Sequence, residues 1–246
     1  MSTNAPVVLI TGASKGLGAE LARLLAARRY RLILAARGAG PLHQIADELA
    51  GQTEVVALPG DVADIAHAER LVALGLERFG QIDVLVNNAS TIGLSPMPTL
   101  DQYPLDTLTA VFQTNAIAPL RLTQLVLPGM RSRDTGTIVN ISSDAAVQAY
   151  PTWGGYGASK AALEHLTRVL AAELEGSGVR VYIVDPGDMD TEMHRAAEPG
   201  VDLSDLPGPA PSAQAIVRLI EQERAPFARF EAQAPQPIAP VISGGR

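Results

Sequence analysis

Residues 7–18 read VVLITGASKGLG, a short aliphatic run followed by a turn that contains three glycines. The aliphatic run predicts a strand buried on both faces, and leucines at helical spacing from Leu17 onward predict a helix directly after the turn. In such a turn Gly12 allows the tight bend, Gly16 lets the backbone approach a phosphate, and Gly18 lets the helix pack closely on the sheet. The sequence therefore predicts a phosphate-binding turn, although short glycine patterns also occur in ordinary strand-helix loops.

The rest of the chain repeats this alternation of strand and helix. Strands are predicted at residues 7–10, 31–36, 54–58, 82–86, 136–142, 179–184 and 227–233. Helices are predicted at residues 17–29, 42–49, 65–79, 105–130, 155–174 and 213–223, the fourth of them interrupted by Pro119 and Pro128. Units of this kind build a parallel sheet with helices on both faces. We therefore expect a single α/β domain over residues 1–246, with a doubly wound parallel sheet of about seven strands.

Two segments lack this periodicity. Residues 188–211 are rich in Pro, Gly and Asp and are long for a loop inside a compact domain, which favours a functional segment such as a substrate lid. Residues 234–246 form a tail that contains Pro and Gly, and we expect it to be loosely ordered.

Composition excludes several classes of function. A formal net charge of -7 argues against nucleic-acid or anionic-membrane partners, which require a basic surface. The chain has no Cys, hence no disulfide and no thiol nucleophile, and its 4 His show no metal-ligand spacing. Without a signal peptide or a long apolar stretch, a cytoplasmic location is expected.

The chain contains only two lysines, Lys15 in the glycine turn and Lys160, while every other basic residue is Arg. Because Arg serves equally well on a solvated surface, we expect the two ammonium groups to stand where a guanidinium would fail. Tyr156 lies four residues before Lys160, on the same face of the predicted helix. An ammonium near a phenol would lower the phenol pKa from about 10 and make a usable general acid or base. Alternatively, the two residues form an ordinary surface pair.

Further polar residues stand where predicted strands end, the edge at which open parallel sheets bind ligands. Ser143 follows the strand at 136–142 and could bond a substrate oxygen, whereas Ser142 is expected to be an ordinary turn residue. Asn87-Asn88-Ala89 and Asp61-Val62 follow two other strands. Asn115 lies inside a predicted helix, where it requires a side-chain partner.

Together these pieces resemble the short-chain dehydrogenase/reductase family, in its compact single-domain branch. They occur in the family's order over residues 6–191, and Pro186-Gly187 with Thr191 completes them. The resemblance implies a Rossmann-like fold, a nicotinamide cofactor and a catalytic set of Asn115, Ser143, Tyr156 and Lys160. It implies cofactor contacts from Gly12, Ser14, Lys15, Gly16, Leu17, Gly18, Arg37, Asp61, Val62, Asn88, Ala89, Tyr156, Lys160, Pro186, Gly187 and Thr191.

The resemblance also implies a role for each catalytic residue. Tyr156 would exchange a proton with the carbonyl or alcohol oxygen, and Ser143 would hold that oxygen. Lys160 would bond the nicotinamide ribose and lower the Tyr156 pKa, and Asn115 would hold a water that connects Lys160 to solvent. Ser90 stands where the family usually has Gly, and Asp188 places an acid near the expected substrate mouth.

The cofactor is expected to be NADP(H). NAD-specific sites of this type carry Asp or Glu after the second strand, to bond the ribose 2'-hydroxyl. Arg37 stands there instead and could pair with a 2'-phosphate, as could Lys15. The expected reaction is hydride transfer between NADP(H) and a carbonyl or secondary alcohol, with the protein most simply a carbonyl reductase.

Other readings remain. A non-catalytic NADP(H)-binding sensor would need the glycines but neither Tyr156 nor Lys160. A sugar-nucleotide epimerase would differ in glycine spacing and carry a larger C-terminal domain. The substrate pocket is expected from residues 91–98, 144–153 and 188–211, with Trp153 either lining it or packing in the core. We expect a homodimer or homotetramer through residues 105–130 and 155–174, a dimer being favoured because the family's usual C-terminal strand ending in Asp-Gly-Gly is missing.

Overall fold

A computed structural model describes residues 5–234. Seven strands form one sheet: β1 (Val7–Thr11), β2 (Arg31–Ala36), β3 (Val55–Pro59), β4 (Val84–Asn87), β5 (Gly136–Ile141), β6 (Val179–Asp185) and β7 (Phe227–Glu231). Every neighbouring pair is parallel, in the order β3-β2-β1-β4-β5-β6-β7. The central strand β1 is buried along its whole length, as its run of aliphatic residues predicts. The expected doubly wound, Rossmann-like parallel sheet is confirmed.

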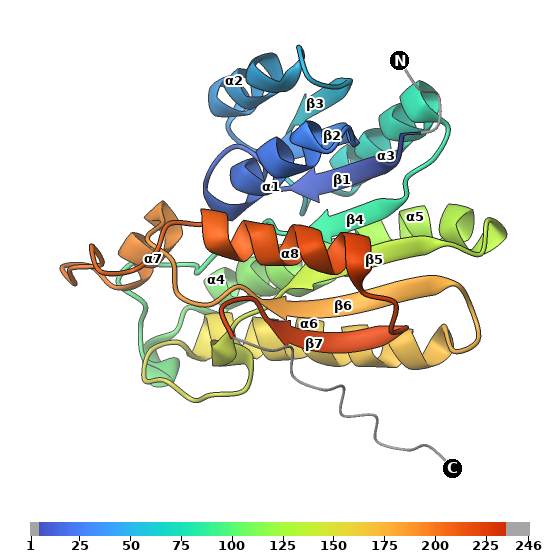
Figure 1. Ribbon diagram of the computed structural model, residues 1–246. Coiled ribbons are helices and arrows are strands. Elements are labelled where there is room, and N and C mark those ends of the chain that lie inside the picture. Colours follow the sequence, from blue (N-terminus) through green and yellow to red (C-terminus); the bar gives the residue numbers. More distant parts are fainter. Residues whose placement is uncertain (1–4, 235–246) are drawn as a thin grey trace.

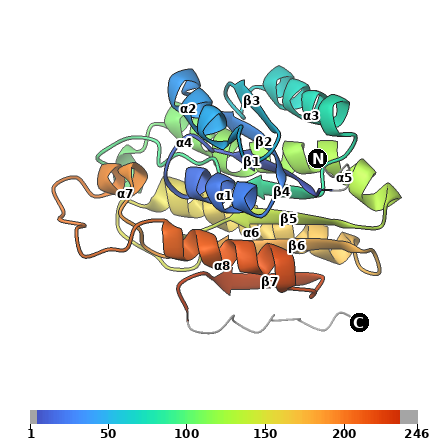
Figure 2. The same cartoon turned by 45° about the horizontal axis from the view of Figure 1, so that its top comes forward.

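Helices cover both faces of the sheet (Figures 1 and 2). One face carries α1 (Gly16–Ala27), α2 (Ala39–Leu49) and α8 (Ala210–Gln222), whose leucines and isoleucines pack in one core cluster. The other carries α3 (Ile65–Phe79), α4 (Leu105–Phe112), α5 (Ala118–Ser132) and α6 (Gly154–Glu173), with a second cluster beneath α3, α5 and α6. The helix α7 (Glu192–Ala197) lies beyond the carboxyl ends of the strands, at the left of Figure 1.

The long helix predicted at 105–130 is irregular just before Pro119, one of the two predicted interruptions, but not at Pro128. A π-helical segment (Gln113–Ile117) separates α4 from α5. Pro119, four residues after Asn115, lies at the start of α5 directly after this segment and cannot donate an N–H to the Asn115 carbonyl, whereas Pro128 stays inside that helix. The helix therefore changes its hydrogen bonding next to Pro119 without ending.

The segment at 188–211 is not wholly aperiodic, because it contains α7 and the first residues of α8. Thr191 caps α7 by accepting a hydrogen bond from the His194 N–H. The other element ends differ from the predicted ones by a few residues, which is usual for boundaries. Of the predicted tail at 234–246, only Ala234 falls among the described residues, and the rest lies outside them.

The order of the strands places the site. The sheet grows from β1 toward β2 and β3 on one side and toward β4 and β5 on the other, so the chain reverses its winding between β1 and β4. Ligands of open parallel sheets bind at such a point, outside the carboxyl ends of the strands. The glycine turn follows β1 there, and Asn88 follows β4.

Candidate active site

The glycine turn has the conformation that a phosphate site requires. Gly12 and Gly16 both have a positive φ, +67° and +54°, which other residues rarely adopt. A Cβ at Gly18 would collide with the carbonyl oxygen of Gly12, so only glycine lets α1 start this close to the turn. Lys15, the N-cap of α1, makes no side-chain cap, which leaves the first N–H groups of the helix available to an anion. The turn therefore fits the diphosphate of a dinucleotide.

Asn88 and Thr11 hold this turn against the end of β4. The Asn88 side-chain amide donates to the carbonyl oxygens of Thr11 at 2.9 Å and of Gly12 at 3.2 Å. The Thr11 hydroxyl accepts from the backbone N–H groups of Asn88 and Ala89, both at 3.0 Å. Asn88 thus supports the backbone of the turn.

Other residues expected to contact the cofactor lie along the same edge. Arg37 is exposed directly after β2. After β3, Val62 is buried and the Asp61 carboxylate accepts the Ala63 N–H at 2.9 Å. Beyond β6, Thr191 faces the glycine turn, because its methyl group would be 3.8 Å from a Cβ at Gly16.

The loop between β6 and α7 is also held in place. The Gly187 N–H donates to the Asp185 carboxylate at 3.0 Å, and the Ser212 hydroxyl donates to the Pro186 carbonyl at 2.7 Å. These bonds place Pro186 and Gly187 between the end of β6 and α8. Ser14 and Leu17, also expected at the cofactor, belong to the glycine turn and the first turn of α1.

The four expected catalytic residues come from three elements. Tyr156 and Lys160 lie one turn apart on α6, Ser143 follows β5, and Asn115 lies in the π-helical segment. Tyr156 is 8% exposed and Lys160 2%. The Lys160 ammonium donates to the Ile141 carbonyl at 2.7 Å and lies 5.6 Å from the centroid of the Tyr156 ring.

The protonation of this pair differs from the sequence-based expectation. Burial raises the pKa of Tyr156, and hydrogen bonding with Ser143 and Ser90 only partly opposes it. The expected lowering by Lys160 is not seen in this arrangement, since the ammonium is directed at a backbone carbonyl. Burial also lowers the pKa of Lys160 to about 8, against the attraction of Glu164. Burial therefore keeps the phenol protonated at neutral pH, but a raised pKa also makes it a weaker acid, so proton transfer requires stabilisation of the phenolate.

Asn115 is fully buried, and its amide forms four hydrogen bonds. Its oxygen accepts from the Thr91 N–H at 2.8 Å and from the Ser90 hydroxyl at 3.1 Å. Its nitrogen donates to the Thr91 carbonyl and the Ser159 hydroxyl, at 2.8 and 2.9 Å. Ser159 in turn donates to the Tyr156 carbonyl at 2.6 Å. These partners explain both an Asn inside a helix and a Ser at position 90.

Ser143 has an acidic neighbour. Its hydroxyl donates to Asp144 at 2.9 Å, and the Tyr150 hydroxyl donates to the other oxygen of the same carboxylate at 2.6 Å. The hydrogen bond to Asp144 raises the pKa of Tyr150, and the charges of Asp188 and Asp185 add to this effect. Asp188, predicted near the substrate mouth, is exposed. The region around Ser143 is therefore acidic.

The three segments predicted to form the substrate pocket meet at Tyr156. They contribute to one apolar cluster, separate from the two main cores, made of Ile92, Met97, Ala145, Trp153, Tyr156, Ala196 and Ala197. The Trp153 ring packs edge-on against the rings of Tyr156 and Tyr150. The distances between ring centroids are 5.8 Å to Tyr156 and 6.1 Å to Tyr150. Trp153 therefore packs directly on Tyr156.

Three residues at this site were missed or misjudged from the sequence. Ser142 is buried and donates to Glu164 at 2.8 Å, so it is not an ordinary turn residue. Glu164 itself was visible in principle, because it continues the four-residue spacing of Tyr156 and Lys160. Ser159 carried no signal, because serine is common on helices.

Comparison with known proteins identifies the family. The model of the short chain dehydrogenase family matches residues 6–202. The chain belongs to the short-chain dehydrogenase family. It is similar to the ketoacyl reductase HetN of a Nostoc species, with 35% identity over 88% of this chain and 75% of that protein. It is also similar to a 1,6-dihydroxycyclohexa-2,4-diene-1-carboxylate dehydrogenase of Pseudomonas putida, with 35% identity over 78% of this chain and 71% of the relative.

Similarity to solved structures supports the same family. An alcohol dehydrogenase of the archaeon Thermococcus sibiricus, complexed with 5-hydroxy-NADP, superposes with a TM-score of 0.83 at 28% identity. That match covers 95% of this chain and all of the other. The protein is thus an oxidoreductase of the short-chain dehydrogenase family. Within residues 5–234, no helix is long and apolar enough to cross a membrane, and no three acidic or His side chains group as a metal site.

Proposed function

We propose that this protein is an NADP(H)-dependent carbonyl reductase, which interconverts a carbonyl compound and a secondary alcohol. The observation that carries the proposal is that Tyr156, which belongs to the apolar cluster, lies beside Ser143 and Lys160. A glycine turn shaped for a dinucleotide follows β1 at the same edge of the sheet. A non-catalytic sensor would not need a buried lysine beside a buried tyrosine. Burial of both groups costs free energy, and a binding function alone does not offset it.

Each residue then has a defined task. The cofactor, when bound, supplies or accepts the hydride. Tyr156, kept neutral by burial, donates its phenolic proton to the carbonyl oxygen, and Ser143 orients that oxygen. Lys160 stabilises the phenolate that remains. The apolar cluster around Trp153 and Met97 excludes water from the reacting atoms.

The preference for NADP(H) is supported by Arg37, which is exposed at the end of β2 where a carboxylate would accept the ribose 2'-hydroxyl of NAD. The guanidinium suits a 2'-phosphate. The structural relative complexed with an NADP derivative is consistent with this choice. The segment at 188–211 is proposed to act as a lid, since α7 brings Ala196 and Ala197 onto the Tyr156 cluster.

The first experiment is a screen of ketones, β-keto thioesters, quinones and pterins with NADPH and with NADH. β-Keto thioesters are included because of the likeness to a ketoacyl reductase. We expect reduction of at least one class, with a higher kcat/KM for NADPH. NADPH binding without turnover of any compound would favour the sensor.

The same screen tests the cofactor preference. Arg37→Asp is expected to lower the efficiency with NADPH by about ten- to a hundredfold, the worth of a hydrogen bond to a charged group, and to spare NADH. Arg131→Asp, at an exposed arginine near the end of α5, is the matched control. Equal or better efficiency of the unmodified protein with NADH would contradict the preference.

A further inference from the structure

A third side chain extends the catalytic face of α6. Glu164 lies one turn beyond Lys160, just as Lys160 lies one turn beyond Tyr156. Its side chain is 1% exposed. A carboxylate is rarely buried so completely unless other groups hold it, because it loses its hydration.

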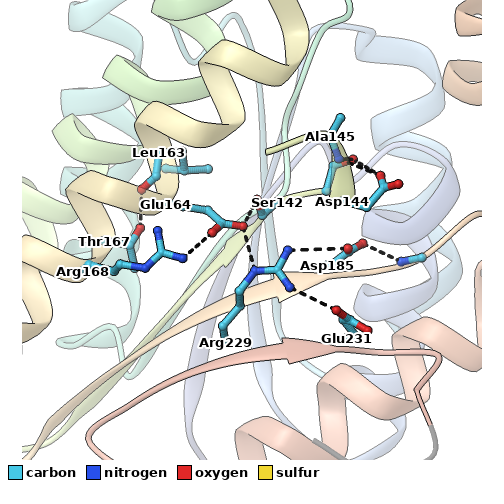
Figure 3. Close-up of polar contacts among 12 residues, drawn as sticks. Ser142, Asp144, Ala145, Leu163, Glu164, Thr167, Arg168, Asp185, Arg229 and Glu231 are labelled. Atoms are coloured by element: carbon cyan, nitrogen blue, oxygen red, sulfur yellow. Dashed lines mark hydrogen bonds and ion pairs between the residues drawn. The ribbon is translucent and has the colours of Figure 1, made fainter. Parts of the chain in front are cut away.

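Three donors from three different parts of the fold hold the Glu164 carboxylate (Figure 3). The Ser142 hydroxyl, at the end of β5, and the Arg229 Nε, on β7, both donate to one carboxylate oxygen, at 2.8 and 3.0 Å. The Arg168 guanidinium, one turn further along α6, donates to the other oxygen at 2.7 Å. Buried ion pairs contribute little net stability, so stability alone does not account for this cluster.

The cluster is joined to the catalytic residues through the end of β5. Lys160 donates to the carbonyl of Ile141, and Glu164 accepts from the side chain of the next residue, Ser142. Ser143 follows immediately. Two neighbouring turns of α6 thus hold two consecutive residues of the strand that presents Ser143.

The charge of Glu164 also connects it to the catalytic residues, because it affects the protonation of Lys160. Lys160 is almost completely buried, and desolvation lowers its pKa to about 8. Glu164 is the charged group that opposes this shift. Its negative charge therefore favours the protonated form of Lys160, which is the form that stabilises a phenolate on Tyr156.

The Arg229 guanidinium, besides its bond to Glu164, forms ion pairs with two more carboxylates. It lies 3.7 Å from Asp185 on β6 and 3.3 Å from Glu231 on β7. Asp185 accepts the N–H of Gly187. Arg229 therefore links Glu164 to the loop that follows β6, and both Arg229 and Arg168 place a positive charge beside the Glu164 carboxylate.

We propose that Glu164 is a positioning residue for the reaction, whose buried carboxylate keeps Lys160 in its charged form and fixes the strand end that carries Ser143. Arg229 moderates this effect from β7. The assignment of a catalytic task to Lys160 rests on the proposed function, but the charge state of Lys160 can be measured without any substrate.

The test uses the fact that the chain has two lysines. Protein labelled with 13C at the lysine ε-carbon gives two side-chain signals, assigned with a Lys15→Arg variant, and each is titrated by NMR. Glu164→Gln is expected to lower the pKa of Lys160 by about one unit, the scale of losing a nearby opposite charge. Arg229→Gln is expected to raise it. Glu173→Gln, at an exposed glutamate on the same helix, is the matched control and should leave it unchanged.

Two outcomes overturn the proposal: a Lys160 pKa that does not move in Glu164→Gln, or one that falls in Arg229→Gln. Should Glu164→Gln fail to fold, the Arg229→Gln titration decides. Once a carbonyl substrate is found, the alkaline limb of the kcat/KM profile should move to lower pH in Glu164→Gln and to higher pH in Arg229→Gln. Shifted NMR titrations without any turnover would leave Glu164 as proposed and refute the carbonyl reductase. Turnover of a carbonyl compound with an unshifted Lys160 pKa would support the carbonyl reductase and refute the role of Glu164.

Discussion

The ammonium of Lys15 in the glycine turn forms an ion pair with the carboxylate of Glu192, the first residue of α7. This pair connects the predicted cofactor site to the predicted lid. Both side chains are about two-thirds exposed, at 64% and 66%, so the pair is screened by solvent and easily exchanged for a stronger anion. It also shows that Lys15 stands in solvent, where an arginine would fit. The scarcity of lysine therefore indicates a constrained site for Lys160 but not for Lys15.

Removing the ion pair between Lys15 and Glu192 should strengthen the binding of NADPH. Glu192→Gln frees Lys15 for a 2'-phosphate and is expected to strengthen NADPH binding about two- to fivefold, the modest scale of an exposed ion pair. NADH, which lacks the phosphate, should bind as before. Fluorescence titration of both cofactors measures the difference, and an equal change for both would show that Lys15 does not meet the 2'-phosphate.

Lys160→Arg should abolish most activity. Lys160 is 2% exposed, and its ammonium is directed at the Ile141 carbonyl, a space that a larger planar guanidinium does not fit. We expect a loss of at least about a hundredfold in kcat, the range for disabling acid-base chemistry. The assay is steady-state kinetics beside a thermal melt, and a folded variant of near-normal kcat would remove Lys160 from the mechanism.

Gly18→Ala tests the close packing of α1 on the glycine turn. The added methyl would meet the Gly12 carbonyl oxygen and come within 2.6 Å of the Asn88 amide nitrogen, so the turn must shift. We expect a loss of about 1 to 3 kcal/mol in the free energy of unfolding, as for other overpacked sites, together with weaker cofactor binding. In Gly40→Ala, on α2, the methyl meets no heavy atom within 4 Å, and this control should be neutral or stabilising. Equal melting of both variants would contradict the packing argument.

We also predict a homodimer. Leu105 at the start of α4 is 76% exposed, and Ile117 and Val169 are 39% and 44% exposed within the two segments predicted at the interface, residues 105–130 and 155–174. Apolar side chains in this number favour a covered surface. Sedimentation should show a species larger than the 25.8 kDa monomer, shifted toward monomer by Leu105→Glu but not by Leu76→Glu on α3. A monomer under dilute native conditions would refute the prediction.

Much of the fold followed from local patterns. The seven strands are short aliphatic runs between turn residues, and their alternation with helices left one class of topology. Local patterns predicted an interruption at Pro119 but not its form, a π-helical segment that places Asn115 among partners from distant parts of the chain. Asn115 is held by residues 90, 91 and 159, which only the fold brings together. The short helix α7 was not predicted, because six residues carry too little periodicity to be recognised.

The protonation states of Tyr156 and Lys160 could not be predicted from the sequence either. From spacing alone, an ammonium one turn from a phenol predicts a lowered phenol pKa. The structure instead buries Tyr156 and directs Lys160 at the Ile141 carbonyl, so desolvation prevails. Glu164 shows the opposite case, because its four-residue spacing from Lys160 was visible but its burial and its partner Arg229 on β7 were not.

The role of Tyr156 as proton donor is tested by the rate at which purified Tyr156→Phe reduces an accepted carbonyl compound with NADPH. The substitution removes only the phenolic hydroxyl, so the ring should keep its packing against Trp153 and the cofactor site should stay intact. We predict NADPH binding within a few-fold of the unmodified protein and a reduction rate at least about a hundredfold lower, the scale for loss of a general acid. Near-normal turnover by a folded Tyr156→Phe protein would show that Tyr156 is not the proton donor.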